Sequence, residues 1–136
     1  MISLLNSNRS TSSKATSRPL PLPGARVRGS ETGRPVMALL DLLGRRWALR
    51  VLWELRASPV PTFRELQSRC GEVSSSVLAQ RLRELTAAGI LNRCSAGYAL
   101  TPEGRELLRS LAPLERWARR WAQHEKTREA PAPAKR

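Results

Sequence analysis

The sequence predicts a mainly α-helical domain with one short β-hairpin, in the order α-α-α-α-β-β-α. Apolar residues recur at helical spacing through most of residues 35–125. Thr62 and Ser74 stand directly before two such segments, and two short apolar segments flank a turn at residues 95–97. A helix, a turn, a second helix and a hairpin in this order form a winged helix-turn-helix, which places its second helix in the major groove of DNA.

The first two predicted helices are apolar on one side. Pro35 can open a helix because the first turn needs no N–H from it, and Gly44 ends the apolar segment that follows. The second helix covers residues 47–56, and Pro59 and Pro61 stop it. The pattern is also compatible with a one- or two-residue strand beside Pro61.

The two helices of the helix-turn-helix follow. Thr62 is the predicted N-cap of a helix over residues 63–69, and a Cys-Gly turn comes after it. Ser74 is the predicted cap of the next helix, residues 75–88, which Gly89 ends.

The hairpin and a long helix complete the domain. Residues 90–93 and 98–100 are the predicted strands of the wing. Thr101, followed by a proline and a glutamate, is the predicted cap of the last helix, in which Pro113 is expected to cause a bend or a break.

Composition divides the chain into one domain and two tails. Residues 1–34 and 126–136 are rich in proline and basic residues and lack a helical or strand period, so they are predicted to be disordered, with the domain at 35–125. The net charge is +13, and basic residues outnumber acidic ones in all three parts. A basic domain favours an acidic partner, most often nucleic acid, although a general compositional bias toward arginine is an alternative explanation.

The residue types that indicate other functions are sparse. The chain has one histidine, His124, and two cysteines, Cys70 and Cys94, without metal-site spacing, so no metal or other cofactor is expected and the cysteines are interpreted as small apolar residues. No phosphate-binding loop and no nucleophile–base pair indicates an enzyme. No apolar run approaches the roughly 20 residues of a membrane-spanning helix, and no signal peptide is recognised, so a cytoplasmic protein without membrane contact is expected.

Residues 75–88 divide into two faces at about 100° per residue. Three leucines share the predicted core face, whereas Ser76, Gln80 and Arg83 lie opposite them and Arg81 lies on the flank. Glutamine can make a bidentate contact with adenine, and arginine can do so with guanine. The outer face therefore has the side chains of a recognition helix. An ordinary amphipathic helix with a solvated polar face is the alternative for this segment taken alone.

Residues on the neighbouring elements are expected to contact the DNA backbone. Thr62 and Arg64, at the start of the preceding helix, are predicted to bind phosphates. Arg93 is predicted to lie near the tip of the wing, against phosphates or the minor groove. The order of these elements favours a DNA-binding helix over an ordinary amphipathic helix at residues 75–88.

The sequence resembles HxlR-type winged helix regulators over residues 35–122. The resemblance rests on these segments: PV at 35–36, LDLLGRRW at 40–47, LWEL at 52–55, FREL at 63–66, VLAQRLREL at 77–85, GI at 89–90 and LTPEG at 100–104. It implies a bacterial, cytoplasmic, homodimeric transcription factor that binds double-stranded DNA.

The resemblance also implies roles for individual residues. The family's recognition positions fall on Ser75, Ser76, Gln80 and Arg81, so Ser75 and Arg81 join the predicted DNA-binding set. The flank position of Arg81 suits a phosphate contact. Dimer contacts are expected from the first and last helices, here from Met37, Leu40, Leu111, Leu114, Trp117 and Trp121. A pocket for an unidentified small-molecule effector, between these tryptophans and the first helix, is an alternative role for this region.

Two features depart from the family pattern. Arg34 stands where members commonly have a cysteine, so a redox switch at that position is not implied. The wing is short, since only residues 94–97 separate its predicted strands. Two other functions stay open at this point: a winged-helix protein-interaction module, and an architectural DNA binder without sequence preference.

Overall fold

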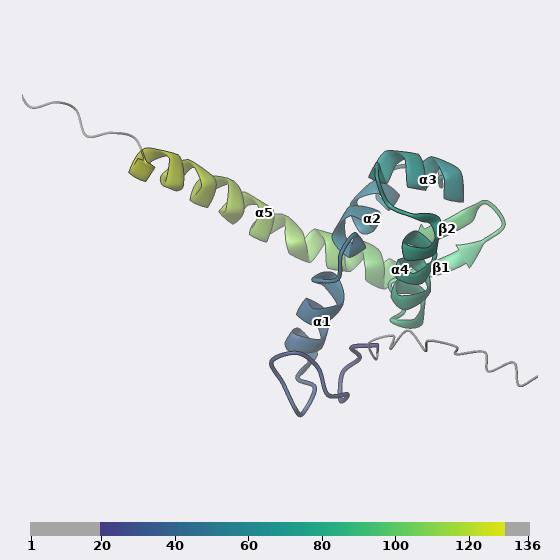
Figure 1. Cartoon of the computed structure of the whole chain (residues 1–136), viewed down its shortest axis with the longest axis horizontal. Coiled ribbons are helices and arrows are strands. Elements are labelled where there is room, and N and C mark those ends of the chain that lie inside the picture. The colour runs from purple at the N-terminus through teal and green to yellow at the C-terminus, as the bar shows by residue number, and fades with distance from the viewer. Residues whose placement is uncertain (1–19, 130–136) are drawn as a thin grey trace, which may run out of the picture.

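A computed structural model describes residues 20–129, and the other parts of the two predicted tails lie outside the described residues. The element order confirms the predicted one (Figure 1). The elements are α1 (Pro35–Leu43), α2 (Ala48–Leu55), α3 (Phe63–Cys70), α4 (Ser75–Ala87), β1 (Leu91–Cys94), β2 (Gly97–Leu100) and α5 (Pro102–Glu129).

The two helices of the helix-turn-helix have the predicted N-caps. The Thr62 hydroxyl accepts a hydrogen bond from the Glu65 N–H at 3.2 Å, and the Ser74 hydroxyl accepts one from the Val77 N–H at 3.3 Å. Each cap binds a backbone N–H that has no partner inside its helix. Both helices therefore begin where the sequence predicts.

The start of α2 differs from the prediction by one residue. Trp47 is the N-cap and has a left-handed backbone with φ 75°, so the helix begins at Ala48. A tryptophan in this conformation is unusual, because a bulky side chain disfavours positive φ. It directly follows the turn of residues 44–46 that joins α1 to α2.

The wing is an antiparallel two-stranded sheet. Leu91 pairs with Leu100 and Cys94 with Gly97, so Ser95 and Ala96 alone form the turn. Within residues 20–129, the optional strand beside Pro61 does not form. Instead the Pro61 carbonyl oxygen lies against Gly97, where an added Cβ would come within 2.7 Å of it. Glycine at this position lets the chain before α3 pack against the wing.

The hydrophobic core joins α2, α3 and α4 to the hairpin. Leu78, Leu82 and Leu85 are completely buried, which confirms the predicted inner face of α4. The other large side chains that are almost fully buried are Val51, Leu52, Leu66 and Leu91. This core fixes the rotation of α4, so that its polar face points away from the protein.

α5 begins on the hairpin and then extends away from the rest of the domain (Figure 1). The Thr101 hydroxyl donates to the Gly89 carbonyl at 2.7 Å and accepts from the Gly104 N–H at 3.0 Å. The helix runs without interruption through Pro113, so the predicted break is absent. Because Pro113 and Arg109 are exposed, water can bind the Arg109 carbonyl that lacks its helical donor.

Residues 20–34, which fall within the arm predicted to be disordered, form a hydrogen-bonded loop. Gly24 N–H donates to the Gly33 carbonyl at 2.9 Å, and Val27 is buried. The Arg28 N–H donates to Asp41 of α1 at 3.3 Å, which ties the loop to that helix. The predicted domain limits at 35 and 125 stay predictions.

Replacement of Thr101 by alanine is expected to lower the free energy of unfolding by about 1–2 kcal/mol, since it removes the cap of α5. Urea unfolding followed by circular dichroism measures the effect. Ser110→Ala is the control on the same helix, because the Ser110 hydroxyl only donates to the Glu106 carbonyl on an exposed surface. Equal losses in the two variants would contradict the capping role.

Candidate nucleic-acid interface

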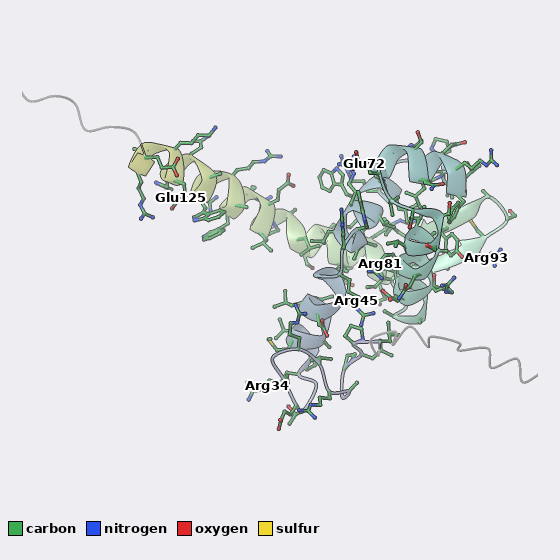
Figure 2. The ribbon with its side chains drawn as sticks, viewed as in Figure 1. Arg34, Arg45, Glu72, Arg81, Arg93 and Glu125 are labelled. Carbon is green, nitrogen blue, oxygen red and sulfur yellow. The ribbon has the colours of Figure 1, made fainter. Side chains whose placement is uncertain are left out.

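The outer face of α4 presents polar side chains to solvent (Figure 2). Ser76 and Arg83 are exposed, and Gln80 is half-buried. The Ser76 hydroxyl lies 3.3 Å from that of Ser74, and the Ser75 hydroxyl accepts from Gln67 Nε2 at 3.1 Å. The serines are thus held by local hydrogen bonds at the start of the helix, with the longer side chains beyond them.

A hollow of about 510 Å³ lies between α3 and the start of α4. Arg64 and Ser75 both line it, so the structure brings these two predicted DNA-binding residues to one surface. Thr62, two residues before Arg64, is also exposed. Its hydroxyl oxygen already accepts the capping hydrogen bond of α3. Arg64 and Arg83 are exposed, and neither has an ion-pair partner within residues 20–129.

Arg93 lies on the wing, apart from α4 (Figure 2). It pairs with Tyr98 in the sheet register, and its guanidinium lies 6.0 Å from the centre of the Tyr98 ring. The turn itself contains Ser95 and Ala96, so Arg93 is the basic side chain of the hairpin.

Arg81 is bound within the protein. Its Nε donates to the Arg46 carbonyl at 2.7 Å, and its Nη1 lies 3.2 Å from each carboxylate oxygen of Glu84. Only 15% of its side chain is exposed. The flank position predicted from the helical angle therefore directs Arg81 to the turn between α1 and α2, and its guanidinium is not displayed with that of Arg83.

Four of the six residues expected at a dimer interface are exposed large apolar side chains. Leu40, Leu114, Trp117 and Trp121 are each more than half exposed, and the two tryptophan rings stack with their centres 6.0 Å apart. Met37 and Leu111, the other two predicted residues, are partly buried.

Three further large apolar side chains are exposed and were not among the predicted dimer residues. Val36, Leu49 and Trp53 are 60%, 48% and 41% exposed. Leu49 and Trp53 line a groove of about 490 Å³ between α2 and α5. The signal in the sequence was that α2 carries more apolar residues than one core face needs.

The cysteines have different environments. Cys70 is buried in the core, as expected, and its burial together with the charge of Glu54 raises the pKa of its thiol, against a smaller effect of Arg50. Cys94 lies on β1 and is exposed, so it is not part of the core. Within residues 20–129, no cluster of three or more His, Cys, Asp or Glu side chains is arranged to hold a metal, and no helix is long and apolar enough to cross a membrane.

The family model of the HxlR-like helix-turn-helix matches residues 42–126 of this chain, which include α2, α3, α4, the wing and most of α5. The chain belongs to the HxlR-like family. This is a family of transcriptional regulators, so the protein is a DNA-binding regulator of transcription.

Individual HxlR-like and related proteins agree with this assignment. An HTH-type transcriptional regulator of Synechocystis sp. is 33% identical over 104 residues, which cover 70% of this chain and 76% of that protein. A possible HxlR family transcriptional factor from Thermoplasma volcanium superimposes with a TM-score of 0.57 at 27% identity, covering 65% of this chain and 85% of that one. Quinone-bound YodB of Bacillus subtilis gives 0.59 at 29% identity, covering 62% and 96%.

Proposed function

We propose that this HxlR-like protein acts as a homodimer whose two α4 helices read the major groove at two half-sites. One observation carries the proposal: the helix that follows the turn has a polar outer face with an exposed, unpaired Arg83, while its inner face is completely buried. An arginine in this position is available for a bidentate contact with guanine. Symmetric dimers of such domains bind half-sites about one helical turn apart.

Arg64 is proposed to contribute affinity without sequence preference. It lies on the surface shared by α3 and the start of α4, beside a hollow that Ser75, the first residue of α4, also lines. A phosphate there gains from both the guanidinium and the positive end of the helix dipole. Arg93 on the wing is proposed to make a second phosphate contact, whereas Arg81 is proposed to act inside the protein.

The proposed dimer places exposed apolar side chains of α1 and α5 between two copies. Leu40 of α1 and Leu114, Trp117 and Trp121 of α5 are large apolar side chains that are each more than half exposed. A partner copy that covers these side chains would remove them from water, which is the main favourable term in association.

Arg83→Ala and Arg64→Ala are expected to affect DNA binding differently. In fluorescence anisotropy with duplexes selected from genomic fragments, Arg83→Ala should weaken binding by about 1–3 kcal/mol and relax preference at one base pair. Arg64→Ala should weaken binding to all duplexes alike and reduce the salt slope by about one.

The same titration separates the proposal from its two rivals. Arg119→Ala is the matched control, since Arg119 lies on α5 and pairs with Glu115 at 2.8 Å. Unchanged operator affinity in Arg83→Ala would refute the assigned groove face. Binding by the wild type without sequence preference would indicate an architectural protein, and no binding even at low salt would indicate a protein-interaction module.

A further inference from the structure

Glu84 lies beside the polar face of α4 and accepts hydrogen bonds from three side chains. Its Oε1 accepts from Arg45 Nη1 at 2.8 Å, from Gln80 Nε2 at 3.2 Å and from Arg81 Nη1 at 3.2 Å. The Glu84 side chain is 11% exposed and that of Arg45 is 6% exposed. Arginines from the α1–α2 turn and from α4 itself therefore hold the carboxylate in one place.

The carboxylate restricts how the Gln80 amide can be oriented. An ionised carboxylate only accepts hydrogen bonds, so Gln80 must direct an N–H, and not its carbonyl oxygen, toward Glu84. The second N–H and the carbonyl oxygen stay available for another partner. A donor and an acceptor side by side are the pair with which glutamine recognises adenine.

We infer that Glu84 is a positioning residue that fixes the orientation of the Gln80 amide and thereby the base that α4 prefers at that position. The inference rests on the proposed function, because it concerns a side chain assigned to the major groove. Arg45 acts one step further away, since it anchors the carboxylate from the turn between α1 and α2. Arg81 has the same anchoring role and for that reason is not displayed to DNA.

The Glu84→Gln variant tests whether the carboxylate, and not the size of the side chain at position 84, orients the Gln80 amide. A glutamine at 84 has the same size, but its amide donates as well as accepts. The Gln80 amide can then bind it in either orientation and can present either pattern of donor and acceptor to the groove. The variant should therefore lose base preference at one position and keep the part of the affinity that comes from phosphate contacts.

The experiment uses the full-length chain and a pool of randomised DNA duplexes. The wild type selects a preferred sequence from the pool, and the base pair read by Gln80 is the one at which Gln80→Ala loses preference. At that pair the wild type should favour one base by about tenfold or more, and Glu84→Gln by less than about threefold. Glu125→Gln is the matched control, because it removes a carboxylate that pairs with Arg128 at 2.8 Å on the distant end of α5 (Figure 2).

The outcomes distinguish this inference from the proposed function. If the wild type selects no sequence, the proposed function fails and the inference fails with it. If the wild type and Gln80→Ala behave as expected but Glu84→Gln retains the full preference, the inference alone is overturned.

A second measurement is made on the wild type and therefore does not depend on whether Glu84→Gln folds. In ¹⁵N spectra of the free wild type, the side-chain amide of Gln80 is assigned by its loss in Gln80→Ala. It should exchange with solvent more slowly than the side-chain amide of exposed Gln123. Equal exchange rates would show that Glu84 does not hold the amide and would overturn the inference.

Discussion

Replacement of Arg45 by methionine is expected to lower the free energy of unfolding by about 3 kcal/mol. Only 6% of the Arg45 side chain is exposed, and its Nη1 lies 2.8 Å from Glu84 Oε1. Removing it leaves the Glu84 carboxylate with Arg81 as its remaining cationic partner in a poorly hydrated position. Chemical denaturation of the wild type and the variant measures the loss.

The control for this prediction is a surface ion pair with the same N–O distance. Arg119 Nη2 also lies 2.8 Å from a glutamate, Glu115, but the arginine side chain is 74% exposed. Arg119→Met should therefore cost less than about 1 kcal/mol. Adding Glu84→Gln to Arg45→Met should restore part of the stability, because the side chain that lost Arg45 is then neutral. Equal losses in Arg45→Met and Arg119→Met would contradict the structural role of the buried pair.

The combined replacement of Trp117 and Trp121 by alanine is expected to convert the proposed dimer into a monomer. Both rings are more than half exposed in the single chain and stack on each other, so they offer a contiguous apolar area to a partner copy. Sedimentation velocity at micromolar concentration measures the change in mass.

Loss of the dimer should also weaken DNA binding. Two linked recognition helices gain about 10²–10⁴-fold in affinity for a site with two half-sites, and the monomer loses this gain while its affinity for a single half-site stays the same. Arg120→Ala, between the two tryptophans on α5, is the control and should stay dimeric. A double variant that stays dimeric would exclude these tryptophans from the interface.

Features set by neighbouring residues were predictable from the sequence. The caps at Thr62, Ser74 and Thr101 depend on a hydroxyl and a backbone N–H three residues later, so a local pattern is sufficient to find them. The buried face of α4 follows from the spacing of its leucines alone. These features place the recognition helix.

Features set by distant residues were not predictable in the same way. Arg81 binds the Arg46 carbonyl 35 positions away, and Arg45 binds Glu84 39 positions away, so no local pattern distinguishes these arginines from the solvent-facing Arg83. The spacing of α4 placed Arg81 on the flank but did not show what lies beside that flank. The continuous helix through Pro113 depends similarly on the exposure of that part of α5.

The most direct test of the central claim is the ratio of two affinities of the full-length wild type at about 150 mM salt. One duplex is the sequence selected from the randomised pool, and the other has the same base composition in scrambled order. Sequence reading by the outer face of α4 predicts that the selected duplex binds at least about 10³-fold more tightly. Equal affinity for the two duplexes would contradict it.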